Sequence, residues 1–272
     1  MLNINTNIMS LTAQKNLTGS QNALSQAINR LSSGKRVNTA ADDAAGLAIS
    51  TSQTASINAL TQGAANANNG ISMVQTAAGA LQSTVDNLQR IRQLAVEAGD
   101  GSLDSNALAN LNSEVQTRLG ELTRVAGQTT FNGQTVLSAA GTVAFQIGAF
   151  SGQQISITFG NTVWDSAGLG VNALTVSSAA AAQTAISTID AALTKVNTFQ
   201  ATLGASQNTF AAAVTTTTTQ ATNMSAARSQ ITDADFATET ANLSKAQVLQ
   251  QAGISVLAQA NSMPQQVLKL LQ

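Results

Sequence analysis

The chain has 272 residues, of which 43% are hydrophobic, 9% are charged and 3% are aromatic, and its formal net charge of −1 gives no general attraction for nucleic acid. Soluble proteins usually carry about 25% charged residues, so this composition favours close packing of small side chains over solution chemistry. Because cysteine and histidine are both missing, disulfide frameworks, zinc fingers, thiol nucleophiles, Ser-His-Asp triads and histidine-ligated metals are excluded.

The N-terminal segment is predicted to form an amphipathic helix, because apolar residues recur at heptad spacing. The leucines that repeat every seven residues are Leu17, Leu24 and Leu31. Residues 1–41 contain no acid, and they lack the basic region and continuous apolar stretch of a secretory signal peptide. The chain has no apolar run of 18 residues, so we expect no membrane insertion.

The strongest periodicity runs from about residue 44 to residue 98. In a strict three-four spacing from Ile57 to Ala95, eleven of twelve positions are apolar. The large side chains of this seam, which we expect to take part in subunit packing, are Ile57, Leu60, Ile71, Val74, Leu81, Val85 and Leu88. Such a pattern predicts a long helix in a coiled-coil-like bundle, about 80 Å in length.

Turn signals then divide the middle of the chain. Gly99-Asp100-Gly101 ends the long helix, and a second helix is predicted over 104–127. Phe131-Asn132-Gly133 marks a turn, and alternating apolar residues predict a β-hairpin at about 142–160. The following loop is expected to be anchored by Trp164.

Helical spacing returns over about 180–228 and again from 237 to the C-terminus. The run Thr215–Thr219 is a poor helix former, which leaves two interpretations open: a segment held by packing, or acceptors for O-glycosylation. Pro264 is expected to kink the last helix. The heptad stripe of that helix consists of Leu249, Val256, Met263 and Leu270.

These elements predict a mainly α fold, an elongated coiled-coil-like helical bundle with paired N- and C-terminal helices and a small β-hairpin. Each terminal helix carries an apolar stripe that it cannot bury alone, so it must pair with the other terminal helix or with other copies.

Four segments resemble bacterial flagellin and occur in the same order as in that family: residues 31–50, 88–102, 124–137 and 227–272. The resemblance implies a structural subunit that self-assembles into the flagellar filament for motility. Residues 1–40 and 237–272 would be the inner core lining the filament channel, and residues 41–236 the outer core. The short middle indicates a flagellin made of core domains alone.

The resemblance also implies partners and a location. The partners would be many copies of the same chain, an export chaperone on the C-terminal helix, the hook-junction and filament-cap proteins, and an innate-immune Toll-like receptor. The protein would be extracellular, exported by the flagellar type III apparatus without a cleaved signal. No cofactor, metal or catalytic residue is expected.

Two further groups of residues follow from the resemblance or from charge. Arg90, Leu94 and Glu114 match positions that contact the receptor in some flagellins, and the alternative is an axial subunit contact. The charged residues at the two predicted hinges, expected to start helices and form salt bridges, are Arg36, Asp42, Asp43, Arg228, Asp233 and Asp235.

Two other readings of the sequence remain. A hook–filament junction protein would share the terminal helices but match less densely in the outer region. A secreted coiled-coil adhesin would need a globular head, for which residues 128–176 are short. An enzymatic function is the least favoured hypothesis, because the residue types present leave no catalytic group of residues.

Overall fold

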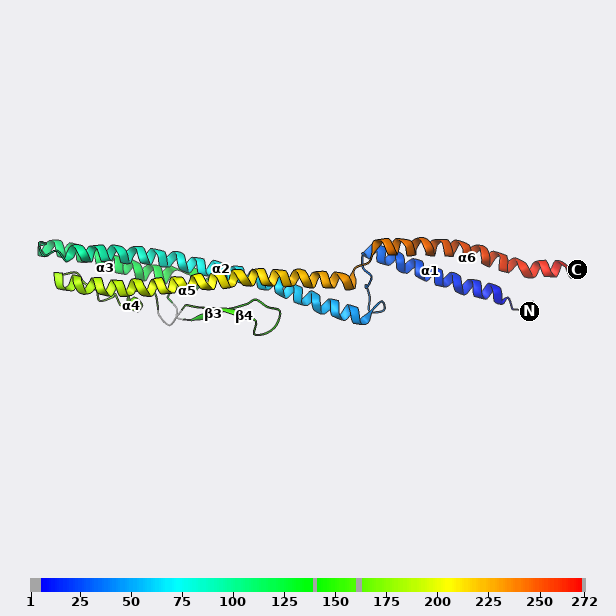
Figure 1. Cartoon of the computed structure of the whole chain (residues 1–272), viewed down its shortest axis with the longest axis horizontal. Helices are drawn as coiled ribbons and strands as arrows, with labels where there is room; N and C mark the ends of the chain where they lie inside the picture. Colours follow the sequence, from blue (N-terminus) through cyan, green and yellow to red (C-terminus); the bar gives the residue numbers. More distant parts are fainter. Residues whose placement is uncertain (1–5, 139–140, 160–162, 271–272) are drawn as a thin grey trace. The chain divides into compact units, whose positions relative to one another are not determined.

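The computed structural model describes residues 6–138, 141–159 and 163–270, without the side chains of 264–270. Its helices are α1 (Ile8–Ser33), α2 (Ala44–Ala98), α3 (Ser105–Gln128), α4 (Ser166–Leu169), α5 (Ala179–Thr232) and α6 (Phe236–Leu270) (Figure 1). Its strands are β1 (Thr130–Phe131), β2 (Gln134–Thr135), β3 (Thr142–Gln146) and β4 (Gln154–Thr158). The fold is mainly α, and the predicted hairpin is present as β3–β4. A second small hairpin, β1–β2, forms where only a turn was predicted. None of the described helices combines the length and apolarity needed to cross a membrane.

Contacts divide the chain into two compact units. We call Met1–Ala55 with Asn223–Gln272 the terminal unit, and Ser56–Thr222 the central unit. These boundaries differ from the expected division at 40/41 and 236/237, because the first turns of α2 and the last turns of α5 contact the residues that connect the helices. Arg228 of α5, for example, donates a hydrogen bond from Nη1 to Oγ1 of Thr54 in α2 at 3.2 Å.

The central unit has one hydrophobic core formed by α2, α3, α5 and the β3–β4 hairpin. The predicted seam of α2 faces this core, since Leu60, Val74, Leu81, Val85 and Leu88 are buried. Ile57 and Ile71 are half-buried at its margin. The heptad pattern therefore identified both the helix and its buried face.

The β3–β4 hairpin lies on this core with its backbone against α2. Phe145 and Ile155 face each other across the strands, and the Phe145 ring meets Phe210 of α5 edge-on at a centroid distance of 5.4 Å. A Cβ added at Gly63 would overlap the carbonyl of Ile147, so only glycine allows this approach. The turn at Asn132-Gly133, with φ of 50° and 79°, closes a second, shorter hairpin of β1 and β2.

Trp164 anchors the segment after β4, as the sequence predicted. Its ring stacks on Phe199 of α5 at a centroid distance of 4.2 Å and an interplanar angle of 10°. Its Nε1 donates to the carbonyl of Phe159 at 3.1 Å, which satisfies the buried polar atom. The one-turn helix α4, which follows directly, was expected to be loop.

Helix α5 extends to Thr232, beyond the predicted end at 228. Its threonine run is helical, and each hydroxyl donates to a carbonyl three or four residues earlier in the chain, which satisfies the hydroxyl without stabilising the helix. Four of the five threonines are exposed, and Thr217 is buried. This arrangement fits a segment held within its helix, and it does not test glycosylation.

In the terminal unit, α1 and α6 lie side by side (Figure 1). Helix α1 is shorter than the 1–40 expected, because Gly34 adopts a left-handed φ of 68° and ends it at Ser33. A Cβ added at Gly253 of α6 would lie 3.3 Å from Cδ1 of Leu17, so the two helices approach closely there. The helix α6 continues through Pro264 to Leu270.

Candidate assembly surface of the terminal unit

The predicted apolar stripe of α6 faces solvent. Leu249, Val256 and Met263 are 48%, 56% and 44% exposed, and the side chain of Leu270 lies outside the described residues. The described residues of α6 that are buried or half-buried include small ones beside larger ones: Glu239, Leu243, Ala246, Gln250, Gly253, Leu257, Ala260 and Ser262. About half of each side chain of the stripe is therefore left uncovered by α1 and open to another molecule.

On α1, the predicted leucines are more buried than the predicted stripe of α6. Leu17, Leu24 and Leu31 are half-buried, while Ala13 and Ala27 are the buried residues of this helix. Near the N-terminus, Asn7 donates from its amide to the carbonyl of Ala260 at 2.8 Å. The pairing of the two ends thus uses small side chains and one amide anchor as well as leucine.

Exposed apolar side chains are concentrated in the terminal unit. Among the described residues, Val96 and Phe150 are the exposed large hydrophobics of the central unit. Those of the terminal unit, besides the α6 stripe, are Ile8, Met9, Leu11, Ile28, Ile49, Phe236, Val248 and Ile254. Exposed apolar surface of this density marks a protein–protein contact.

The two connections of the terminal unit, residues 34–43 and 233–235, are tied together by hydrogen bonds. The amide of Ala234 donates to the carbonyl of Gly34 at 3.0 Å. The guanidinium of Arg36 donates to the carbonyls of Gln230 and Ile231 at 3.3 and 2.8 Å. A cation there satisfies carbonyls that the end of α5 leaves free.

The salt bridges expected for Asp42 and Asp43 are wrong. Asp43 accepts from the amide of Gly46 at 2.9 Å and so caps the start of α2. The Oδ2 atom of Asp42 accepts from the amides of Asn38 and Thr39 and from the Thr39 hydroxyl. These bonds favour the charged carboxylate, so the Thr39 amide first, then its hydroxyl and the Asn38 amide lower the pKa of Asp42.

The salt bridges of Arg228 with Asp233 and Asp235 are also wrong. Hydrogen bonds from the hydroxyls of Ser229 and Thr232 lower the pKa of Asp233. Asp235 caps α6, and hydrogen bonds from the Thr238 hydroxyl and the Ala237 amide lower its pKa. In each case amides and hydroxyls make the direct hydrogen bonds to the carboxylate, and the more distant charges of Arg228 and Lys35 further lower the pKa of Asp233.

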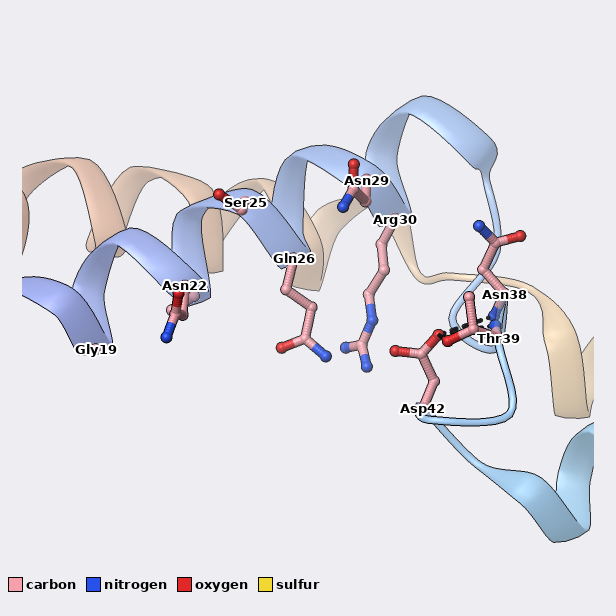
Figure 2. Close-up of a pocket in the computed structure, with 10 residues that line it drawn as sticks. Gly19, Asn22, Ser25, Gln26, Asn29, Arg30, Asn38, Thr39 and Asp42 are labelled. Carbon is pink, nitrogen blue, oxygen red and sulfur yellow. Dashed lines mark hydrogen bonds between the residues drawn. The ribbon is translucent and has the colours of Figure 1, made fainter.

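An ion pair that the sequence did not reveal joins α1 to α6. Arg30 Nη1 lies 3.9 Å from Oε2 of Glu239, and the Glu239 side chain is only 10% exposed. The Nε atom of Arg30 is buried without a hydrogen-bond partner in the described structure. Figure 2 shows Gln26, Arg30 and Asp42 directed toward the same hollow. Nothing in the sequence relates Arg30 to Glu239, since they are far apart in the chain.

The third group of predicted residues lies in the central unit. Arg90 of α2 and Glu114 of α3 form an ion pair, with Nε and Oε1 3.0 Å apart, and both side chains are partly exposed. Leu94 is 1% exposed within the core. In the described structure, Arg90 and Glu114 are therefore accessible to a partner, and Leu94 is not.

Comparison with known proteins identifies the family. Residues 4–142 match the bacterial flagellin N-terminal helical region, and residues 186–271 match the bacterial flagellin C-terminal helical region. The chain belongs to the bacterial flagellin family. It is a structural subunit of the flagellar filament, an extracellular appendage that serves motility, and the family consists of structural proteins.

Individual relatives agree along the whole chain. The flagellin of Xenorhabdus nematophila is 41% identical over 309 aligned positions, which cover 99% of each protein. The flagellin of Serratia marcescens is 38% identical, again over 99% of each. The crystal structure of Bacillus cereus flagellin superposes with a TM-score of 0.51 and 29% identity, covering 60% of this chain and 94% of that one.

These matches favour the filament subunit over a junction protein or an adhesin. The comparison with Shigella flexneri agrees with the short middle of this chain, because the relative is much longer and matches over only part of its length. That flagellin is 48% identical over 188 residues, which are 69% of this chain but 34% of the longer relative.

Proposed function

We propose that the terminal unit forms the inner core of the filament, with α1 and α6 packing against other copies around a central channel. The observation that carries this proposal is the exposed stripe of Leu249, Val256 and Met263 on α6. Burying a side chain of this size stabilises an assembly by about 1.5–3 kcal/mol. A monomer cannot recover that free energy, whereas contact with a neighbour can. The central unit would then be the outer core.

Polymerisation of purified protein tests this proposal. The full chain should give long tubular filaments in electron microscopy, and a chain truncated before residue 237 should give none. A sharper variant is Val256→Asp, which places a charge on the stripe without touching α1. Its matched control is Thr216→Asp on the exposed face of α5. Filaments of normal length from Val256→Asp would show that the stripe does not take part in the subunit interface.

The same stripe supports a proposal for the export chaperone. An amphipathic helix with an exposed apolar face suits a partner that binds helices in a groove. We expect chaperone binding and polymerisation to exclude each other, because both would cover Leu249 and Val256. Pull-down of a chaperone by monomer but not by preformed filaments would agree with this, and equal capture by both would contradict it.

For Arg90 and Glu114 we propose an axial contact between subunits of the outer core. Their partial exposure supports a surface role, and the burial of Leu94 in the described structure argues against receptor contact through that residue. Reversing the charges of all three linked residues, as Arg90→Glu, Glu114→Arg and Arg118→Glu, keeps both internal ion pairs but changes the surface. Loss of polymerisation with unchanged receptor signalling is the expected result.

The remaining partners follow from family membership. We propose that hook-junction and cap proteins contact the ends of the polymer, and that the flagellar type III apparatus exports the chain. Accumulation of the chain inside cells lacking that apparatus is the expected outcome.

A further inference from the structure

A groove runs along the α1–α6 pair, lined by side chains of both helices. Its volume is about 580 Å³, and its walls include Lys15, Gln26 and Arg30 of α1 and Glu239 and Lys245 of α6. A neighbouring hollow shares Gly19, Ala23, Gln26 and Arg30 with it and continues to Asp42 (Figure 2). The two hollows therefore form one surface along α1, wide enough to receive several side chains.

The charges of the groove are poorly satisfied. In the first hollow, Lys15, Arg30 and Lys245 face the single carboxylate of Glu239, so its lining carries a net charge of +2. Asp42 at the far end of the second hollow lowers the net charge of the joint surface to +1. Among the described residues, Lys15 and Lys245 form no ion pair. Arg30 reaches Glu239 only at 3.9 Å, and its buried Nε has no partner. A buried unsatisfied donor is costly, and an incoming carboxylate or carbonyl would remove that cost.

The complementary charges lie in the same unit. Asp42, Asp43, Asp233 and Asp235 are exposed in the two connections. Their partners in the described structure are amides and hydroxyls, and none is in an ion pair. A carboxylate has about four acceptor positions, so each of the four can accept further hydrogen bonds. With Lys35 and Arg36 included, the two connections carry a net charge of −2, which complements the cationic groove.

We propose that the groove receives the acidic connections of a second copy of this chain. The inference rests on the proposed role of the terminal unit as a subunit interface, and it names the groove as one half of that interface. Leu249 of the exposed apolar stripe lines the groove as well, so polar and apolar contacts would be continuous. A contact between two different surfaces of the same unit does not close on itself and propagates into a helical polymer.

A double-mutant cycle on polymerisation tests the pairing. One arm neutralises the groove with Lys15→Gln and Lys245→Gln. The other neutralises the connections with Asp43→Asn and Asp235→Asn, because asparagine caps helices about as well as aspartate. Each arm alone should raise the critical concentration about tenfold, and the combined variant should add little to either arm. Independent, additive effects would overturn the proposal.

The control cycle replaces the groove lysines with Arg124→Gln and Lys195→Gln in the central unit, which change the net charge equally, away from both the groove and the connections. This control should show no coupling to the Asp→Asn pair, and coupling as strong as in the groove cycle would assign the effect to net charge. If the unaltered chain itself fails to polymerise, the proposed function fails, whereas additive cycles in a polymerising chain overturn only this inference.

A steric variant provides a second readout. A Cβ added at Gly19 meets no atom within 4 Å, so Gly19→Leu fits the helix pair. If a second copy occupies the groove, this side chain obstructs it, and filaments should be lost while circular dichroism of the monomer is unchanged. Gly120→Leu on α3, which is equally open, is the control. Normal filaments from Gly19→Leu would contradict occupation of the groove.

Discussion

Gly70 of α2 lies directly against the ring of Phe210 of α5, which is fully buried. A Cβ added at Gly70 would lie 2.8 Å from Cε1 of that ring, closer than a real contact allows. Helices α2 and α5 thus pack closely at Gly70 because glycine has no side chain to collide with the Phe210 ring. The space between α2 and α5 at this position is therefore too small for any side chain at residue 70.

Replacing Gly70 with alanine should destabilise the protein despite the better helix propensity of alanine. The added methyl forces the Phe210 ring to move in a packed core, which costs about 1–3 kcal/mol. Gly79 lies in the same helix with open space around it, so Gly79→Ala should instead stabilise the fold by up to about 1 kcal/mol. Urea unfolding followed by circular dichroism measures both, and equal shifts would refute the close contact.

Removing the indole of Trp164 should be among the most damaging single changes in the central unit. The ring is 6% exposed and stacks on Phe199, so Trp164→Ala loses about 3–5 kcal/mol. Phe150→Ala, at a residue that is 67% exposed, serves as the comparison and should change the free energy of unfolding little. Because the variant has no tryptophan, denaturation must be followed by circular dichroism.

The ion pair of Arg92 and Asp190 links α2 to α5 and predicts a pH effect. Its Nε and Oδ1 atoms are 2.7 Å apart, and the hydrogen bond from Arg92 lowers the pKa of Asp190 below its ordinary value of 3.8. A carboxyl whose folded pKa is lowered contributes stability above its unfolded pKa and loses it as the pH falls through the folded pKa. The contribution should therefore be present at neutral pH and disappear below about pH 4.

Melting temperatures of the monomer between pH 7 and pH 3 measure this effect. Asp190→Asn and Arg92→Gln should each flatten the acid side of the profile, and the double variant should match either single one. A profile that keeps its full slope in Asp190→Asn would show that other carboxyls carry the acid sensitivity.

The cap of α2 gives a prediction in the terminal unit. Asp43→Ala leaves the amide of Gly46 without its acceptor and should cost about 1 kcal/mol, while Asp43→Asn should cost only a few tenths. Thermal unfolding of the monomer, followed by circular dichroism, compares the two variants without the subunit contact proposed for Asp43. A loss from Asp43→Asn as large as that from Asp43→Ala would mean that the charge matters more than the cap.

The sequence predicted α2 well because its seam combines heptad spacing with large residues that fill one core. On α6 the same reasoning found a stripe that the chain itself leaves uncovered, so its packing against other copies stays a prediction. Leu249, Val256 and Met263 are the conspicuous repeats, but the helix pair buries Ala246 and Ala260 beside Gly253. Periodicity reports that a face is apolar, and it does not report whether that face is covered within the chain or by a neighbour.

The hinge aspartates show a second limit of the sequence. Adjacent acids and bases suggested ion pairs, yet Asp42 and Asp233 are held by neighbouring hydroxyls and amides. Local bonds form without ordering a long side chain, and spacing alone cannot rank the two possibilities. The Arg30–Glu239 pair was missed for the opposite reason, since only the pairing of α1 with α6 brings the two residues together.

The stacked indole of Trp164 has a practical consequence for experiments in solution. It is the single tryptophan of the chain and is buried in the central unit. Its fluorescence therefore reports the folding of that unit, while light scattering reports growth of the polymer. With these two optical signals, a variant that cannot fold is distinguished in one cuvette from a variant that folds and cannot join a filament.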